Sequence, residues 1–392
     1  MRIDEVQRAL AAQDLAGWLF CDIYGRDTAA KRVLGLGPVP STRRWYYFIP
    51  ASGEPVKLTS RIERHILAHL PGRAALYSGR EELSALLQAE LGHRGRIAMQ
   101  YSPGCELPAI SLCDGGTVEL MRALDNTPVC SGDLLQAQEA LLTQEEMATH
   151  RQAGDRVHGI FREVFAAMAA AIRAGRPLTE RGAMDFIQAC WARDGLTSDG
   201  DLPYVAVDDH AQDPGYIPTA ATDRPIAPGS RILIDFWVRL DRPGAVYYDI
   251  TWAAYAGSQP PAAYRDLAAA VFAAREEAKA FIQDRFAAGR PVAGWEVDAH
   301  LRDFFAARGL ERGLAHRTGH SMGALSHYFG ANLDDFETHD TRRLLPGTLF
   351  SIEPGLYLDG MGVRSEINAY LTPSGRLEVH GPEQTELVLL PI

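Results

Sequence analysis

The sequence predicts an α/β protein of two domains: a small N-terminal domain over residues 1–135, and a larger domain over residues 136–392 that contains two copies of one unit. The chain length of 392 residues exceeds the size at which a single hydrophobic core stops growing. Short apolar strands alternate with helical stretches in the first part. In the second part, the segment Ala-Gly-Arg-Pro at residues 174–177 returns unchanged at residues 288–291.

The N-terminal domain is expected to contain strands at residues 16–20, 44–49 and 56–58. The second strand holds the aromatic cluster Trp-Tyr-Tyr-Phe at residues 45–48, which is either core or an interface, with core the simpler assignment. Turn-forming residues between positions 125 and 133 mark the end of this domain.

The C-terminal domain is expected to begin with a long helix. Thr143 is a suitable N-cap, and apolar residues then recur at steps of three and four up to Ile172, which predicts one buried face. A Gly-Arg-Pro sequence ends this helix. A second helix is predicted at residues 180–193, and the pair is predicted to recur at residues 262–289 and 296–308.

Acidic residues follow each copy of the repeat at matched places. Both copies lead to a Pro-Gly turn and a short apolar strand, and seven positions after the proline stands Asp235 in one copy and Glu353 in the other. A second acid follows in each copy, Asp249 and Glu366, so each copy is predicted to hold two carboxylates in its strands. Because successive strand residues point to opposite faces, one acid per strand can face a shared cleft. Ionised carboxylates are rarely buried unpaired, and a cation is the simplest partner for four of them.

Three histidines lie between the second helix pair and the Glu353 strand. They are His316, His320 and His327, and neighbouring glycines let the backbone approach a ligand closely. Divalent ions such as Mn, Co or Zn accept carboxylate oxygen together with imidazole nitrogen. Two such ions about 3.5–4 Å apart can activate a shared water and polarise the carbonyl that it attacks. The pattern therefore predicts a site for two divalent metal ions and a hydrolytic reaction.

At these residues the sequence resembles the metallopeptidases of the pita-bread fold, a family that includes Xaa-Pro aminopeptidases, prolidases, methionine aminopeptidases and creatinase. The resemblance covers residues 140–390, and the N-terminal region resembles the smaller α/β domain of creatinase and prolidase-type members. It implies a pita-bread domain with an internal pseudo-twofold duplication. The segments that carry it are the aspartate motifs Ile234–Phe236 and Tyr248–Thr251, the histidine motif Thr318–His320, and the glutamate motifs Ser351–Tyr357 and Gly362–Glu366.

The resemblance also implies a role for each ligand residue. Asp235 is the expected ligand of one metal ion, and His320 and Glu353 are the expected ligands of the other. Asp249 and Glu366 are expected to bridge the two ions. Glu353 is also expected to handle the proton of the attacking water, as a carboxylate held next to the metal ions can.

Four further residues match positions around the substrate in this family. His327 matches the histidine that steadies the substrate carbonyl and its oxyanion, and His316 matches one that lines the substrate pocket. Tyr357 and Arg364 match residues that contact substrate or relay protons. The alternative for all four is ordinary hydrogen bonding in a crowded cleft.

The chain departs from the family pattern around the first aspartate motif. Gly215, directly before Tyr216, stands where prolidases and Xaa-Pro aminopeptidases usually have a histidine. We expect His210 to reach the same region and, with Tyr216, to contact substrate. Trp237 and Trp252 replace a small residue and an arginine, which weakens any transfer of substrate preference.

Composition limits the partners and the location of the protein. The net charge of -11 argues against a nucleic-acid partner, which needs a basic face. The five cysteines form no close pair, so neither a disulfide framework nor a zinc-thiolate site is expected, and a reducing, cytoplasmic location fits. The N-terminus lacks the features of a signal peptide, and no apolar run is long enough to span a membrane. A homodimer is the expected assembly.

The predicted function is hydrolysis of a peptide bond in short, proline-containing peptides by an Xaa-Pro peptidase of aminopeptidase P or prolidase type. Which side of the proline is cut stays open, and Gly215 keeps a carboxypeptidase-like polarity or a non-prolyl substrate as an alternative. Metal-free, creatinase-like hydrolysis predicts loss of the ligand residues, yet all five are present. The last alternative is a non-catalytic module that binds peptides.

Overall fold

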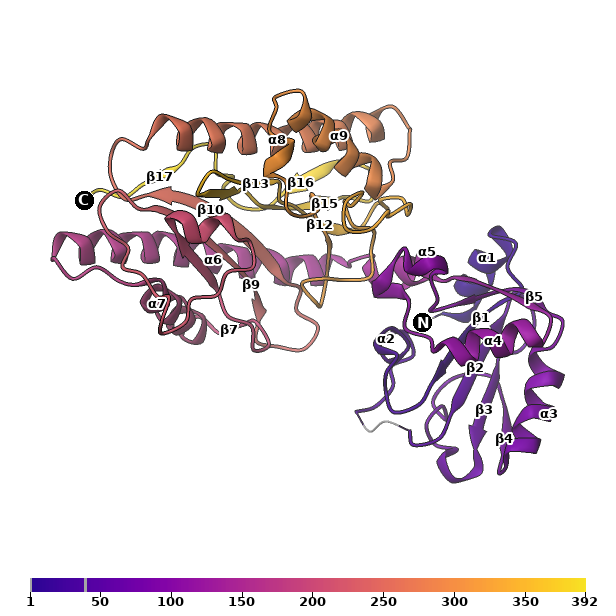
Figure 1. Ribbon diagram of the computed structural model, residues 1–392. Helices are drawn as coiled ribbons and strands as arrows, with labels where there is room; N and C mark the ends of the chain where they lie inside the picture. The colour runs from indigo at the N-terminus through magenta and orange to yellow at the C-terminus, as the bar shows by residue number, and fades with distance from the viewer. Residues whose placement is uncertain (1, 39–40) are drawn as a thin grey trace. The chain divides into compact units, whose positions relative to one another are not determined.

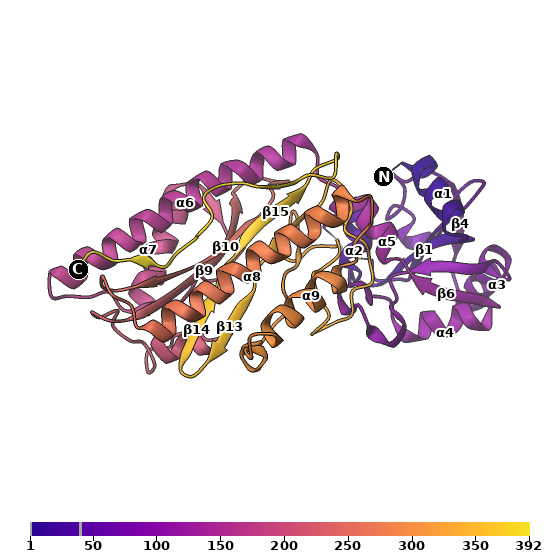
Figure 2. The same cartoon turned by 90° about the horizontal axis from the view of Figure 1, so that it is seen from above.

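A computed structural model describes residues 2–38 and 41–392 of the chain. It divides into two compact units, Met1–Glu139 and Ala140–Ile392, which we call unit 1 and unit 2. Figures 1 and 2 show both units in two directions. None of the helices within the described residues combines the length and the apolar character that crossing a membrane requires.

Unit 1 contains a mixed sheet with the strand order β4-β3-β2-β1-β5-β6, in which β1 is antiparallel to β2 and parallel to β5. Its strands are β1 (Gly17–Asp22), β2 (Trp45–Pro50), β3 (Val56–Ser60), β4 (Arg73–Tyr77), β5 (Gly95–Met99) and β6 (Asn126–Cys130). Its helices are α1 (Ile3–Ala12), α2 (Thr28–Val33), α3 (Arg80–Leu91), α4 (Gly115–Ala123) and α5 (Gly132–Leu135). The strands β1, β2 and β3 confirm those predicted from the sequence.

The aromatic cluster of β2 belongs to the core. Trp45, Tyr46, Tyr47 and Phe48 are each at most 2% exposed. Successive strand residues point to opposite faces, so a run of four buried aromatic residues requires cover on both faces of the sheet. The assignment of this cluster to the core is therefore confirmed.

Unit 2 begins with α6 (Gln144–Arg173), followed by α7 (Glu180–Arg193), α8 (Ala262–Ala287) and α9 (Gly294–Ala306). Its strands are β7 (Leu196–Thr197), β8 (Tyr204–Val207), β9 (Arg231–Leu240), β10 (Tyr248–Tyr255), β11 (Ser321–Met322), β12 (Leu349–Ile352), β13 (Gly355–Leu358), β14 (Met361–Arg364), β15 (Ile367–Leu371), β16 (Leu377–Val379) and β17 (Val388–Leu389). Thr143 caps α6 as predicted: its Oγ1 accepts the N–H of Glu146, whose carboxylate accepts the N–H of Thr143.

The strands of unit 2 form two sheets and a hairpin. One sheet has the order β17-β10-β9-β7, with β8 also paired to β9, and the other has the order β11-β12-β15-β16. The strands β13 and β14 form the hairpin. Figure 1 shows α6 and α7 on one side of these strands and α8 and α9 on the other. One apolar cluster joins α6 and α7 to β9 and β10, and another joins α8 and α9 to β12 and β15.

The two copies of the repeat share their backbone geometry. Gly175 after α6 and Gly289 after α8 have φ values of 68° and 64°. Gly229 and Gly347, in the two Pro-Gly turns, have φ values of 88° and 98°. Only glycine adopts positive φ without strain, which explains why these positions stay glycine in both copies. The sequence repeat is therefore a repeat of structure, as the predicted duplication requires.

Successive residues along β9 and β10 point alternately to the apolar core and to the opposite face of the sheet, where the acids lie. Ile234 and Phe236 of β9 and Ile250 of β10 pack into the apolar cluster of α6 and α7. Asp235 and Asp249 therefore point to the opposite face of the sheet, away from these helices. This placement was predicted from the period of the strands.

The prediction that all four acids lie in strands is wrong for the two glutamates, Glu353 and Glu366. β14 ends at Arg364 and β15 begins at Ile367, because the chain changes its partner from β13 to β12 at this point. Glu366 stands in the break, where its N–H donates to the carbonyl of Thr251 at 3.3 Å. Glu353 directly follows β12 in the same way. Both glutamates thus lie at strand ends, whereas both aspartates lie within strands.

Candidate active site

The structure brings together the acids of both copies and one histidine. Asp249, His320 and Glu366 are buried and offer ligand atoms that all lie within 4.8 Å of one another. The Nε2 atom of His320 is 3.6 Å from Asp249 Oδ2 and 3.2 Å from Glu353 Oε1. Asp235 lies close enough for the charges of Asp249 and Glu353 to act on its carboxyl group.

Two carboxylate oxygens in this cluster have no protein partner. Within the described residues, Asp235 Oδ1 and Glu366 Oε1 are buried and accept no hydrogen bond. Leaving a buried carboxylate oxygen unpaired is unfavourable, and such oxygens are the ligands that divalent cations take. The residues present therefore fit a site for divalent metal ions.

Two small hydroxyl residues orient the ligand side chains. Ser351 Oγ accepts the N–H of His320 at 2.9 Å and donates to Glu353 Oε1 at 3.0 Å. Thr251 Oγ1 donates to Glu366 Oε2 at 2.9 Å and accepts from Arg364 Nε at 2.9 Å. Each hydroxyl thus fixes two groups of the site at once.

Burial and mutual repulsion act on the acids of this cluster. Burial raises the pKa of Asp235 to about 7, and it also raises the pKa values of Asp249 and Glu366, with the neighbouring carboxylates acting in the same direction. Burial also favours the neutral form of Glu353, but the charges of His320 and other nearby basic groups outweigh it and lower the pKa of Glu353 below its usual value. Glu353 is therefore ionised at neutral pH and able to accept a proton.

A chain of hydrogen bonds runs from His316 into the cluster. His316 Nδ1 is 2.7 Å from the carbonyl of Arg317, which can only accept, so Nδ1 carries the proton. Burial lowers the pKa of His316, so the ring is neutral and its Nε2 accepts from the hydroxyl of Tyr357 at 2.9 Å. Arg364 Nη1 donates to the same hydroxyl at 3.3 Å, and its Nη2 forms an ion pair with Asp235.

His327 lies beside the proposed ligand His320, with ring centroids 4.1 Å apart. The positive charge of His320 is the main cause that lowers the pKa of His327, and desolvation adds to it. The ring of His327 is therefore neutral at physiological pH. A neutral imidazole in this position can donate one N–H to a substrate oxygen.

His210 and Tyr216 belong to a cluster around Glu180. His210 Nδ1 is 2.9 Å from Glu180 Oε1, and Tyr216 donates its hydroxyl to Glu180 Oε2 at 3.0 Å. The ring centroids of His210 and Tyr216 are 4.2 Å apart. The sequence did not single out Glu180, because an acid in the first turn of a helix is ordinary.

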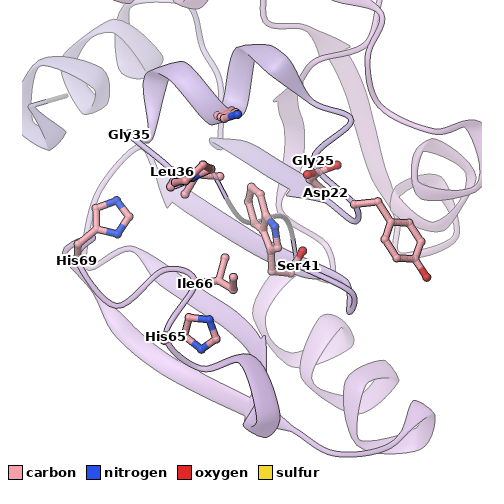
Figure 3. Close-up of a pocket in the computed structure, with 13 residues that line it drawn as sticks. Asp22, Gly25, Gly35, Leu36, Ser41, His65, Ile66 and His69 are labelled. Carbon is pink, nitrogen blue, oxygen red and sulfur yellow. The ribbon is translucent and has the colours of Figure 1, made fainter.

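A separate hollow of about 520 Å³ lies in unit 1, and Figure 3 shows its histidines, His65 and His69, near Leu36 and Ile66. Asp22 is the single acid among its described lining residues, and its Oδ1 already accepts the backbone N–H groups of Arg26 and Asp27. The carboxylate cluster belongs to unit 2. The hollow of unit 1 therefore lacks the chemistry that the cluster has.

Comparison with known proteins identifies a family and a fold for this chain. The sequence profile of metallopeptidase family M24 matches residues 148–373. The probable dipeptidase PepE of Mycobacterium bovis is 28% identical over 361 residues, which cover 88% of this chain and 85% of that protein.

Solved structures show the same fold. The match to dipeptidase PepE from Mycobacterium ulcerans has a TM-score of 0.71 at 23% sequence identity. It covers 100% of this chain and 97% of the PepE chain. A second match is X-prolyl aminopeptidase from Caenorhabditis elegans, a cytosolic enzyme with a di-nuclear active site. This match has a TM-score of 0.66 at 17% sequence identity and covers 96% of this chain and 61% of the C. elegans chain. The predicted pita-bread fold is thereby confirmed.

Proposed function

Because the chain belongs to metallopeptidase family M24, we propose that it hydrolyses a peptide bond in short, proline-containing peptides with two divalent metal ions in its site. The observation that carries this proposal is the buried cluster of carboxylates and one imidazole, in which Asp235 Oδ1 and Glu366 Oε1 have no partner among the described residues. Cleavage at proline and the number of ions go beyond the family assignment.

The proposed ligands are those that the sequence indicated. Asp235 would hold one ion, His320 and Glu353 the other, and Asp249 and Glu366 would bridge them. Bound Mn, Co or Zn ions supply an activated water and a Lewis acid for the substrate carbonyl. The C. elegans enzyme with a di-nuclear site and the same fold supports two ions.

Two residues are proposed to act on the reacting atoms. Glu353 accepts the proton of the attacking water and returns it to the leaving amine, because a carboxylate beside Arg364 and bound divalent cations would stay ionised. His327 donates an N–H to the substrate carbonyl oxygen and stabilises the negative charge that develops there. His327 can do this because burial favours its neutral ring, and bound cations would disfavour its protonation as the charge of His320 does in the metal-free protein.

Other residues are proposed to bind and orient the substrate. His316 and Tyr357 are joined by a hydrogen bond of 2.9 Å, so the hydroxyl of Tyr357 is held beside the carboxylate cluster, where it can contact substrate or relay a proton. Arg364 links this hydroxyl to Asp235. His210 and Tyr216 are proposed to contact the substrate from the loop that follows β8.

A second candidate is a dipeptidase without preference for proline. The relatives named dipeptidase favour it, and so does Gly215, which leaves this chain without a side chain where prolidases usually have histidine. A metal-free, creatinase-like reaction and a non-catalytic binding module are less well supported, because they do not require the intact cluster of acids.

Hydrolysis of a peptide panel tests these candidates. The purified protein is loaded with Mn, Co or Zn and incubated with Xaa-Pro dipeptides, Xaa-Pro-Xaa tripeptides and non-prolyl dipeptides. Chromatography then identifies the amino acid released from each end. We expect release from Xaa-Pro peptides. Release from non-prolyl dipeptides alone would favour the second candidate, and no release with any ion would contradict peptidase activity.

We also propose that the protein is a cytoplasmic homodimer. Its five cysteines are free thiols, which fits a reducing compartment. Light scattering of the purified protein gives its mass directly, and a mass of one chain would contradict the dimer.

A further inference from the structure

A hollow of about 280 Å³ lies in unit 2, between the first turns of α6 and the strands β15 and β16. His150, which lines it, packs against the ring of Tyr248, with ring centroids 4.8 Å apart. Tyr248 directly precedes Asp249 on β10, so the two side chains point to opposite faces of the sheet. The hollow therefore lies behind β10 from the carboxylate cluster and is distinct from the proposed metal site.

His150 brings an unpaired nitrogen to the wall of this hollow. The residue is 1% exposed, and its Nδ1 is 2.7 Å from the carbonyl of Tyr247, which can only accept, so Nδ1 carries the proton. Burial lowers the pKa of His150 to about 3, so the ring is neutral and its Nε2 can only accept. Within the described residues this Nε2 is buried and has no donor. Because an unpaired buried acceptor is costly, a ligand that donates an N–H or O–H to it is favoured.

Arg151 adds a positive charge to the same wall. Its half-buried guanidinium forms no ion pair and no hydrogen bond in the part of the chain that the structure describes, and the same holds for the hydroxyl of Tyr370. The charge of Arg151 acts on both His150 and Tyr370, which places the three groups close together. A guanidinium can take up a carboxylate through two parallel hydrogen bonds. The hollow can therefore bind a carboxylate next to the unpaired nitrogen.

The rest of the wall offers a negative charge and an apolar surface. Glu378 is the partner of Tyr370 in the pairing of β15 with β16, and its carboxylate, which also pairs with Arg376, can attract an ammonium group. Met147 and Val379 are the apolar lining residues. These groups match the three parts of a free amino acid: its carboxylate, its ammonium group and its side chain. Drug-sized ligands occupy sites of about 300–1,000 Å³, so the smaller volume favours one amino acid over a longer peptide.

We propose that this hollow binds a free amino acid, with the carboxylate on Arg151 and the ammonium group between His150 Nε2 and Glu378. None of these residues has a part in the proposed peptidase reaction. Amino acids are products of that reaction, so the hollow allows a product to act on the enzyme. Only this consequence rests on the proposed function.

Asn368 connects the hollow to the proposed metal site. Its side chain lines the hollow, and its amide binds the backbone N–H and the carbonyl of Asp249. A ligand that takes up hydrogen bonds of this amide weakens its hold on the residue proposed to bridge the ions. We therefore expect a bound amino acid to lower kcat, by about fivefold or more if the coupling is typical of linked sites.

Calorimetry with leucine tests the binding. The metal-loaded protein and the protein dialysed against a chelator should both bind leucine, because the hollow contains none of the proposed metal ligands. Arg151→Gln removes the positive charge and should weaken binding by about tenfold or more. Leucinamide lacks the carboxylate and isocaproate lacks the ammonium group, so each should bind more weakly than leucine.

Arg162→Gln is the matched control. Arg162 is an exposed arginine of the same helix and does not line the hollow, so its replacement should leave leucine binding unchanged. Thermal melts of both variants establish that they are folded. No binding of leucine to the wild-type protein, or equal binding to wild type and Arg151→Gln, would overturn the site. Isocaproate that binds as tightly as leucine would overturn the assignment to amino acids.

Peptide kinetics test the effect on the enzyme. At saturating peptide, leucine should lower kcat of the wild-type protein and of Arg162→Gln, but not of Arg151→Gln. Leucine that only raises KM, equally in all three proteins, binds at the metal ions, and this result would overturn the effector role. If no peptide is cleaved, the proposed function fails by itself, and the calorimetry still decides whether the hollow binds an amino acid.

Discussion

Asn368 holds the backbone of Asp249 at both of its polar atoms: its Oδ1 accepts the N–H of Asp249 at 3.0 Å, and its Nδ2 donates to the carbonyl of Asp249 at 2.5 Å. Asn368 is 1% exposed and lies on β15, whereas Asp249 lies on β10. This side chain therefore joins the sheets of the two copies at the residue proposed to bridge the metal ions.

Replacing Asn368 should weaken metal binding. Asn368→Ala leaves two buried backbone groups of Asp249 without partners and frees the ligand from its position. We expect metal affinity to fall by about 10- to 100-fold, as for other residues that orient ligands, and the free energy of unfolding to fall by about 1–3 kcal/mol. Metal titration by calorimetry and chemical denaturation measure the two effects.

Asn126→Ala is the control for this change. Asn126 is a buried asparagine of unit 1 that also bonds to backbone on both sides, accepting from Arg94 at 2.9 Å and donating to Leu91 at 2.7 Å. Its loss should lower stability without changing metal affinity. If both variants bind metal as the wild-type protein does, Asn368 does not position the ligand.

Removing the metal ions should make stability depend on pH. In the metal-free protein, burial raises the pKa of Asp235 to about 7 and raises the pKa values of Asp249 and Glu366. The folded state then holds protons that the unfolded chain has released, so the contribution of these carboxyl groups to stability falls as pH rises from about 4 through 7. The pKa of His320 is raised by its contacts with Asp249 and Glu353, despite burial, so its contribution is also lost as pH rises.

Thermal melts at pH 6 and pH 8 test this dependence. His316 and His327, whose pKa values are lowered, act in the opposite direction in both forms, so the two forms are compared at each pH. The difference in melting temperature between the metal-loaded and the chelated protein should be larger at pH 8 than at pH 6, because bound cations keep the carboxylates ionised at both pH values. Parallel pH profiles for the two forms would mean that no cation balances these charges.

The predictable parts of this fold were local. The period of two along β9 and β10 predicted which face carries Asp235 and Asp249, and the repeat predicted the glycine turns and helix ends. The same period places Trp237 and Trp252 on different faces of the sheet. Trp237 shares the face of Asp235, whereas Trp252, three positions after Asp249, lies on the opposite face and packs 5.4 Å from the ring of Phe161.

The parts that could not be predicted depend on distant partners. Glu180 is an ordinary acid at a helix start until the loop after β8 folds back and places His210 and Tyr216 on it. Asn368 gains its role only because β15 lies beside β10. The strand break before Glu366 likewise follows from a change of pairing partner, which no local pattern of apolar residues encodes.

Replacing Glu353 by glutamine should remove the proton acceptor while keeping the shape of the side chain. We expect kcat of Glu353→Gln to fall by about 100- to 10,000-fold, the usual contribution of a general base. Steady-state kinetics and metal analysis of the same sample measure the loss and show whether the ions are still bound. Glu337→Gln, which alters an acid bonded to Arg317, should keep its activity. A Glu353→Gln enzyme with kcat near the wild-type value would exclude this role.

The proposed role of His210 depends on its Nε2 atom, since Nδ1 is held by Glu180. Glu180 is fully buried and also accepts the N–H of Val207 at 2.9 Å, so removing the imidazole disturbs a structural cluster as well as any contact with substrate. His210→Asn separates the two effects, because the asparagine amide can replace Nδ1 but has no atom in place of Nε2.

If His210 contacts substrate, His210→Asn and His210→Ala should both lower kcat/KM, by about tenfold or more for a lost hydrogen bond to a bound polar group. Only His210→Ala should also lower the melting temperature, because it leaves the buried carboxylate of Glu180 with one partner fewer. Kinetics on the best peptide and thermal melts of both variants make this comparison. Unchanged turnover in His210→Ala would show that His210 does not take the place of the histidine that Gly215 replaces, and that its ring serves only to pair with Glu180.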